Sequence, residues 1–195
     1  MIAVFDYGAG NLRSVANTLE EIGAEFEVVH DAAGLRRASK IVLPGVGHFG
    51  QMMRSITVQD TLRERIADGV PFLGICIGMQ ALFEGSEEAP DVEGLGLFRG
   101  VVKRFPPHAR CPHTGWNDLE VRPGAKLLPE GARPYVYFNH SYYVPEVPQA
   151  CAICEYAVRY TAALEAGNVF GVQFHPEKSG PVGLAIVRRF VELPC

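Results

Sequence analysis

The first half of the sequence alternates short apolar runs with amphipathic stretches, and this alternation restricts the possible folds more than any other feature. The apolar runs, each short enough for a buried strand, cover residues 2–5, 26–29, 41–43 and 72–75. Amphipathic stretches separate them and include residues 12–22 and 62–66. Strands that alternate with helices are typical of βαβ units. We therefore expect an α/β fold built on a mostly parallel sheet.

The stretch 12–22 gives the clearest helix prediction. Its apolar face comprises Leu12, Val15, Ala16, Leu19 and Ile22. Asn11 is placed to cap the start of this helix, and Gly23 is placed to end it. A glycine-containing turn precedes the helix, but Arg13 stands where a dinucleotide-binding fingerprint needs its third glycine. We interpret that turn as a tight connection.

The second half of the sequence has a different pattern. Closely spaced strand-like runs, separated by turns rich in proline and glycine, cover residues 95–105, 135–144, 151–158 and 169–174. We interpret them as a mixed or antiparallel extension of the sheet. A closing helix is expected over residues 181–192, with Val182, Ala185, Ile186 and Arg189 at helical spacing. The sequence has no linker or internal repeat, which predicts a single domain over residues 1–195.

Composition and charge exclude several classes of function. Hydrophobic residues make up 48% of the 195 residues, but no apolar run approaches the ~20 residues of a membrane-spanning helix. The N-terminus lacks the basic region and cleavage site of a signal peptide, so we expect a cytoplasmic protein. The net charge of −4 argues against nucleic acid as a partner.

The cysteines and histidines do not form a metal-binding pattern. Five scattered cysteines argue against a disulfide framework. Cys151 and Cys154 have no second pair to complete a zinc site, and they lie in an apolar run, so we place them in an ordinary strand. The six histidines show no pair at metal-ligand spacing, so we expect no metal.

Residues 72–82 carry the strongest chemical signal. An apolar strand runs into Gly74-Ile75-Cys76-Ile77-Gly78 and then into a helix, which is the layout of a nucleophile elbow with sulfur in place of a serine oxygen. Such a cysteine sits at the carboxyl edge of the sheet and at a helix N-terminus, where ligands bind and where a thiolate is favoured. The alternative is a small buried residue between packing glycines.

Residues 170–178 place His175 and Glu177 two positions apart at the end of a strand. A histidine there can take the thiol proton and later protonate a leaving amine, while the carboxylate orients the ring. Alone, the pair is equally compatible with a surface histidine. Pro44-Gly45-Val46-Gly47 is a third element, a loop whose backbone N–H groups can face a developing oxyanion, with the N–H of Ile77 as the second donor.

Taken together, these motifs resemble the class I glutamine amidotransferases. The resemblance rests on residues 74–80, 172–177 and 44–47 and runs essentially from end to end. Three further segments, residues 6–12, 112–117 and 137–143, are similar to the glutaminase subunits of imidazole glycerol phosphate synthases. The resemblance implies a flavodoxin-like three-layer α/β fold without a cofactor. It also implies a heterodimer with a (β/α)₈-barrel cyclase that receives ammonia for histidine biosynthesis.

The resemblance also implies a role for each matching residue. Cys76 would be the nucleophile that forms a glutamyl thioester, His175 the general acid and base, and Glu177 the orienting carboxylate. The expected oxyanion donors are Val46 and Ile77. Residues expected to contact glutamine are Gly47, Gln80, Ser141 and Tyr142. Residues expected at the cyclase interface are Trp116, Asn117, Tyr137 and Lys178.

Three other classes of function stay open on the sequence alone. The first is a glutaminase that supplies another acceptor, such as anthranilate, guanylate or pyridoxal phosphate synthesis. The second is a cysteine peptidase or hydrolase of related fold. The third is a binding subunit that has lost catalysis, which the intact Cys76, His175 and Glu177 disfavour.

Overall fold

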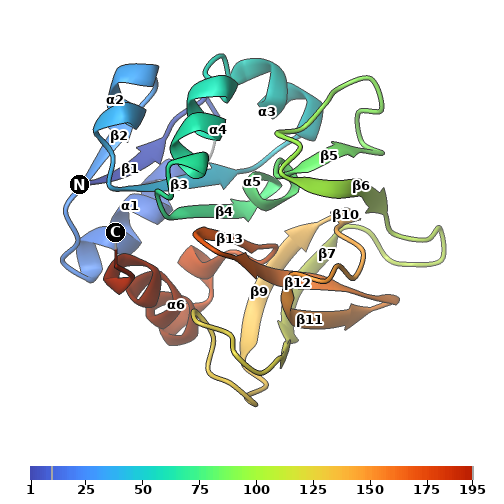
Figure 1. Ribbon diagram of the computed structural model, residues 1–195. Helices are drawn as coiled ribbons and strands as arrows, with labels where there is room; N and C mark the ends of the chain where they lie inside the picture. Colours follow the sequence, from blue (N-terminus) through green and yellow to red (C-terminus); the bar gives the residue numbers. More distant parts are fainter. Residues whose placement is uncertain (10, 195) are drawn as a thin grey trace.

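The computed structural model describes residues 1–9 and 11–194 and confirms the α/β fold (Figure 1). Gly10 of the predicted turn and Cys195 lie outside the described residues. Eight strands form the main sheet, in the order β2 (Phe26–Val29), β1 (Ile2–Phe5), β3 (Lys40–Gly45), β4 (Phe72–Cys76), β13 (Val169–Val172), β12 (Val158–Ala166), β11 (Ala150–Tyr156) and β8 (Glu120–Val121).

The main sheet is parallel on one side and antiparallel on the other. Strands β2, β1, β3, β4 and β13 pair in parallel. Strands β12, β11 and β8 extend this sheet in antiparallel fashion. Every residue of β1, β3, β4 and β13 is buried, because helices cover both faces, and this explains why these strands appear as continuous apolar runs. The predicted mixed sheet with an antiparallel extension is therefore confirmed.

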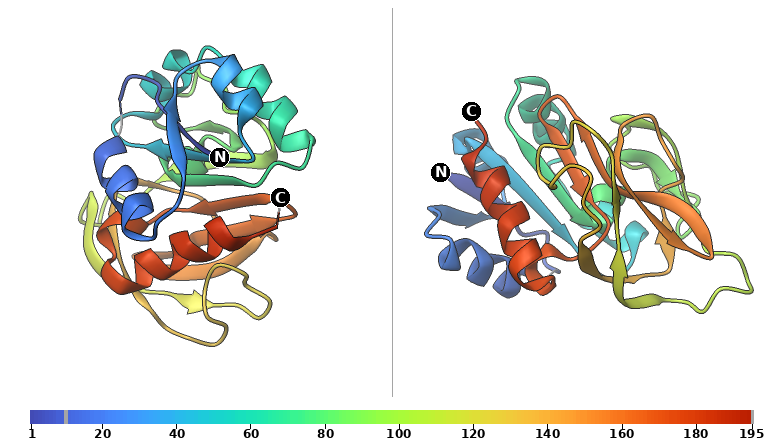
Figure 2. Two further views of the ribbon diagram at one scale, coloured as in Figure 1. Left: turned by 90° about the vertical axis from the view of Figure 1, so that its left-hand side faces the viewer. Right: turned by 90° about the horizontal axis from the view of Figure 1, so that it is seen from below.

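Helices cover both faces of the parallel part (Figures 1 and 2). On one face, α1 (Leu12–Glu21) packs against α6 (Gly180–Glu192). On the other, α2 (Ala32–Arg37) packs against α4 (Gln59–Ala67). The remaining helical segments are α3 (Phe49–Ser55), α5 (Ile77–Gln80) and the 3₁₀ turn η1 (Pro176–Lys178). In residues 1–9 and 11–194, no helix combines the length and apolar character that crossing a bilayer requires.

Two small sheets lie at the carboxyl end of the parallel strands. One contains β5 (Phe83–Ser86), β6 (Phe98–Arg104) and β10 (Tyr142–Tyr143), and the other is a ribbon of β7 (His113–Asp118) and β9 (Tyr135–His140). The sequence interpretation had placed residues 95–105 and 135–144 in an extension of the main sheet, and this was wrong. Most residues of β6 are exposed, so this strand lacks the apolar face that a central sheet would bury.

Strand β12 was missed by the sequence interpretation. It contains Ala162, Ala163, Leu164 and Glu165, residue types that favour helices. Pairing with β11 on one side and β13 on the other overrides that preference. Both cysteines of the Cys151-x-x-Cys154 pattern lie in β11, buried and free, which confirms their placement in a strand.

The ends of the helices differ from expectation in two details. Asn11 occupies the N-cap position of α1 as expected, but its side-chain oxygen accepts from the Ser14 hydroxyl at 2.7 Å and makes no capping bond to the backbone. Gly23 does follow the helix, with a φ of 70° and its N–H donated to the Glu20 carbonyl oxygen at 3.0 Å.

The closing helix α6 is confirmed, and two of the four residues expected at helical spacing face the core, since Ile186 is buried and Val182 is partly buried. Ala185 and Arg189 are exposed. The buried residues of α6 are Gly183, Ile186, Val187 and Phe190.

Candidate active site

Cys76 occupies a strained turn between β4 and α5. Its φ of 55° and ψ of −110° lie outside the regions that residues with a side chain prefer. Such a conformation costs about 1–3 kcal/mol and persists only where surrounding structure enforces it. The predicted strand–turn–helix elbow is confirmed, and the turn places Cys76 at the edge where the parallel strands end.

Glycine is required on both sides of this cysteine. A β-carbon added at Gly78 would lie 2.0 Å from the carbonyl oxygen of Leu43 in β3, and one added at Gly74 would lie 2.5 Å from the carbonyl oxygen of Gly78. Both distances are far below van der Waals contact, and both neighbours are backbone atoms that cannot turn aside. The elbow is therefore held by close packing of α5 against β3 and β4.

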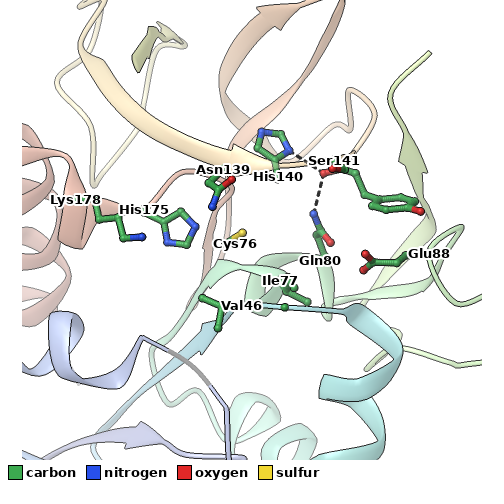
Figure 3. A pocket seen from close by; sticks show the side chains of 12 residues that line it. Val46, Cys76, Ile77, Gln80, Glu88, Asn139, His140, Ser141, His175 and Lys178 are labelled. Carbon is green, nitrogen blue, oxygen red and sulfur yellow. Dashed lines mark hydrogen bonds between the residues drawn. The ribbon is translucent and has the colours of Figure 1, made fainter. Parts of the chain in front are cut away.

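His175 and Glu177 follow the neighbouring strand β13, which pairs with β4 through Val172 and Ile75. The Nδ1 atom of His175 lies 2.8 Å from Oε1 of Glu177, and both side chains are almost fully buried. A carboxylate can only accept, so Nδ1 carries the hydrogen and Nε2 is left to face Cys76. Figure 3 shows the ring beside the sulfur.

The main chain of His175 is fixed from two directions. Its N–H donates to the carbonyl oxygen of Tyr137 in β9 at 2.8 Å. Its carbonyl oxygen accepts from the Ser179 hydroxyl at 2.7 Å, and Ser179 in turn accepts from the Tyr137 N–H at 3.0 Å. The position of the His175 ring therefore depends on the β7–β9 ribbon as well as on β13.

The electrostatic surroundings favour a charged ring. Burial disfavours the imidazolium, but hydrogen bonds to Cys76 and Glu177 and the charges of both groups outweigh burial and raise the pKa of His175 to about 10. The ring is thus protonated near neutral pH, and an imidazolium in contact with sulfur stabilises a thiolate. This arrangement of ring and sulfur is suited to the activation of Cys76 as a nucleophile.

A pocket opens beside the sulfur and is lined by all four residues expected to contact glutamine (Figure 3). Its lining residues are Val46, Gly47, Cys76, Ile77, Gln80, Glu88, Asn139, His140, Ser141, Tyr142, His175 and Lys178. The structure therefore brings together the three triad residues, both expected oxyanion residues and the four expected glutamine contacts.

One expected oxyanion donor is already engaged. The N–H of Val46 donates to the hydroxyl of Tyr7 at 3.1 Å, and this hydroxyl lies 3.3 Å from the Val46 carbonyl oxygen, to which it donates. Burial raises the pKa of Tyr7, which keeps the hydroxyl protonated. Sequence reasoning missed Tyr7, although its place at the end of β1 puts it at the same sheet edge as Cys76.

The expected interface residues lie on the β7–β9 ribbon and its neighbour η1. Trp116 is 56% exposed and packs edge-on against Tyr137, with ring centroids 6.2 Å apart. The ammonium of Lys178 lies 5.7 Å from the Tyr137 ring centroid. Asn117 differs from these three, because its side-chain amide donates to the Glu155 carbonyl oxygen of β11 at 3.1 Å and so braces the ribbon.

Four further residues at the site were missed by sequence reasoning. Glu88, Asn139 and His140 line the pocket, and the side-chain nitrogen of Gln173 lies 3.6 Å from the sulfur. Asn139 and His140 lie in the segment that carried the family resemblance, and Gln173 lies two positions before His175, so their neighbourhood was a usable signal. Glu88 had no such signal. Within the described part of the chain, no cluster of three His, Cys, Asp or Glu side chains is arranged to hold a metal ion.

The fold and this site define a class of enzyme: a cysteine hydrolase with its nucleophile on an elbow and a His–Glu pair on the next strand. The family model for class I glutamine amidotransferases matches residues 3–193. The chain therefore belongs to this family and is an enzyme of the glutaminase type.

Comparison with curated proteins narrows the family. The chain is 48% identical to the imidazole glycerol phosphate synthase subunit HisH of Methanothermobacter thermautotrophicus, over 99% of this chain and 98% of that protein. It is 47% identical to the HisH subunit of Deinococcus radiodurans, over 97% and 92% of the two chains. Among solved structures, a glutamine amidotransferase superposes with a TM-score of 0.76 at 21% identity, covering 98% of this chain and 97% of the other, which supports the fold.

Proposed function

We propose that this chain is the glutaminase subunit of an imidazole glycerol phosphate synthase. In this proposal it hydrolyses glutamine to glutamate and passes the ammonia to a barrel cyclase, which makes imidazole glycerol phosphate and aminoimidazole carboxamide ribotide. The observation that carries the proposal is the end-to-end similarity to HisH subunits, combined with a complete Cys–His–Glu site. The proposal treats residues 1–195 as one domain.

In the first half of the reaction, the Cys76 thiolate attacks the carbon of the substrate's side-chain amide. A carbon–sulfur bond forms and the carbonyl oxygen becomes negative. N–H groups of Val46 and Ile77 would stabilise this oxygen. The tetrahedral intermediate collapses as His175 donates its Nε2 proton to the amide nitrogen, and ammonia leaves from a thioester on Cys76.

In the second half, water attacks the thioester carbon. His175, now neutral, takes a proton from this water, and the carbon–sulfur bond breaks to release glutamate. Glu177 accepts from Nδ1 throughout, which holds the ring and stabilises it whenever it is charged. The cycle regenerates the thiolate–imidazolium pair.

The pocket offers polar groups to the charged amino-acid end of glutamine, where the ammonium and the carboxylate share one carbon. Gly47, Gln80, Ser141 and Tyr142 would surround the bound molecule. Glu88 lies in the same pocket as a carboxylate that can face the substrate ammonium. It is fixed there because one of its oxygens accepts from the Phe49 N–H at 2.7 Å.

Replacement of Tyr7 by phenylalanine is expected to raise glutamate release by the isolated chain roughly fivefold. The change removes the hydroxyl that now occupies the Val46 N–H, and a net hydrogen bond of about 1 kcal/mol corresponds to that factor. Turnover at saturating glutamine measures the effect, with the exposed Tyr135 changed to phenylalanine as the control. Slower turnover would mean that the hydroxyl holds the loop in its productive position.

The ribbon carries the surface proposed for the cyclase. Trp116 and Tyr135 are the exposed large hydrophobic side chains on it, and aromatic residues of this kind are enriched in protein interfaces. The backbone of the same ribbon holds His175. Binding of a partner at this surface would therefore act close to the catalytic ring.

We expect Trp116→Ala to weaken cyclase binding about 30-fold, the effect of losing an interface residue worth about 2 kcal/mol. Titration calorimetry with the cognate cyclase measures it. Val101→Ala serves as the control, because Val101 is also an exposed apolar residue but lies on β6. Equal cyclase affinities of the two variants would show that the interface does not include Trp116 on the ribbon.

The test of the proposed function is glutamate release by this chain alone, with the barrel cyclase, and with the cyclase plus its nucleotide substrate. Strong stimulation by the complete mixture, together with ammonia-dependent product, is the expected result. Stimulation only by a synthase of another pathway would replace the acceptor assigned here. We also propose a cytoplasmic location, because the nucleophile must stay reduced and Cys76 is free.

A further inference from the structure

Gln173 is fully buried beside the nucleophile, and the mechanism described so far gives it no role. It follows β13 directly and lies two residues before His175. Its side-chain nitrogen lies 3.6 Å from the sulfur of Cys76, within the range of a hydrogen bond to sulfur. A buried amide in contact with sulfur can present either its NH₂ group or its oxygen. The NH₂ group would stabilise a thiolate, and the oxygen would stabilise the protonated thiol.

The neighbouring groups decide which end of the amide faces the sulfur. The backbone carbonyl of Tyr142 can only accept, so the group of Gln80 that lies 2.9 Å from it must be the NH₂. The second hydrogen of this NH₂ points to the Gln173 side chain at 3.0 Å, where it requires an oxygen. The other end of Gln173, which faces Cys76, is therefore its NH₂ group.

The Tyr142 carbonyl is itself fixed by further buried groups, of which Figure 3 shows His140. It accepts from Nδ1 of His140 at 2.8 Å, and the Nε2 atom of that ring lies 3.3 Å from the Tyr160 hydroxyl. This hydroxyl also contacts Nδ1 of His113 at 3.3 Å. Since Nδ1 of His140 donates, Nε2 accepts the Tyr160 hydrogen, and His113 must donate to Tyr160.

These histidines stay neutral over the working pH range. Burial lowers the pKa of His140 to about 3 and that of His113 to about 4. The direction of every bond from His113 to Gln173 is consequently constant. None of the linked side chains from His113 to Gln173 can turn its amide or ring over without leaving a buried polar group unpaired, which costs about 1–3 kcal/mol.

We propose that Gln173 is a catalytic hydrogen-bond donor to the Cys76 sulfur and that Gln80 positions it. The donor stabilises the thiolate, as N–H groups stabilise other buried anions. It also offers no acceptor to an S–H group, so the thiol hydrogen can pass only to His175. Formation of the thioester removes the charge on sulfur and weakens this bond, and hydrolysis restores it. This inference rests on the proposed role of Cys76 as nucleophile.

The test is the rate at which iodoacetamide alkylates Cys76 from pH 5 to pH 10, measured at each cysteine by mass spectrometry of peptides. Wild type is compared with Gln173→Met, which removes the donor, and Gln173→Glu, which keeps the shape and the bond from Gln80 but presents an acceptor. Exposed Cys111 is the internal control in every sample. Neither glutamine nor a partner is needed.

We expect both variants to slow alkylation of Cys76 about tenfold below pH 7 and to approach the wild-type rate at high pH, with Cys111 unchanged. A merely structural effect would lower the rate equally at all pH values. Identical pH profiles in the wild type and a folded variant would overturn the inference and leave the proposed function intact. Failure of wild-type Cys76 to react while Cys111 does would overturn both.

A second measurement does not depend on whether the variants fold. In wild-type protein labelled with ¹⁵N, the side-chain amide hydrogens of Gln173 are expected to exchange slowly with solvent. Blocking Cys76 by alkylation should shift one of the two amide resonances, because its acceptor changes from thiolate to thioether. An unchanged Gln173 amide after complete alkylation would contradict the hydrogen bond.

Discussion

Replacing Cys76 with alanine is expected to lower glutamate release at least ~10⁴-fold, because no other group can form the thioester. In the proposed mechanism the Cys76 sulfur bonds to the substrate carbon, and His175, which is hydrogen-bonded to that sulfur, carries the proton. Glutamate release is measured with the partner cyclase present, where turnover is highest.

The matched control is Cys111→Ala, which removes an exposed cysteine and should leave turnover unchanged. Cys76→Ala should also be at least as stable as wild type to urea, so that loss of activity is not loss of fold. Substantial release by folded Cys76→Ala would show that the enzyme does not work through a cysteinyl thioester, and the Cys–His–Glu assignment would fall with it.

The second large effect is expected from a single methyl group at the elbow. Gly78→Ala places a β-carbon 2.0 Å from the Leu43 carbonyl oxygen, and α5 must separate from β3 to admit it. We expect a loss of about 3 kcal/mol in the free energy of unfolding. Glutamate release should fall ~10²-fold or more, because Cys76 and the Ile77 N–H are displaced together.

Gly85→Ala is the control for this prediction. A β-carbon at Gly85 meets only the Val92 carbonyl oxygen at 3.6 Å, an ordinary contact, and its φ is not positive. Urea unfolding and turnover are measured for both variants. If Gly78→Ala were as stable and as active as Gly85→Ala, the elbow would be able to relax, and the strain at Cys76 would not depend on packing against β3.

The parallel half of the fold could be predicted from sequence because its strands are buried on both faces. Strands such as β1 and β4 appear as unbroken apolar runs, and the glycines around Cys76 mark the elbow directly. The antiparallel half of the fold was harder to predict from the sequence. Strand β12 contains helix-favouring residues, and the exposed strand β6 gives no signal of the sheet to which it belongs.

The contact between His175 and Glu177 could be predicted because the two residues are close in sequence and follow one strand. The hydrogen bonds around the Cys76 sulfur could not be predicted from the sequence. The bond from Gln80 to Gln173 joins residues 93 positions apart, and its direction is set by a backbone carbonyl. Likewise, the hydrogen bond between Tyr7 and Val46 joins segments at the ends of two strands, and the sequence pattern of neither strand indicates it.

The pairing of β4 with β13 has a consequence for the order of folding. Cys76 and Gln173 are 97 positions apart, and His175 follows two positions later, so the proposed nucleophile meets its proposed base only after the chain has closed a very long loop. Contacts of this kind form late, because loop closure costs entropy before the contact repays it. A nascent chain with its first half folded thus carries the cysteine without its partner, and it becomes an active hydrolase only when the last strands have joined the sheet.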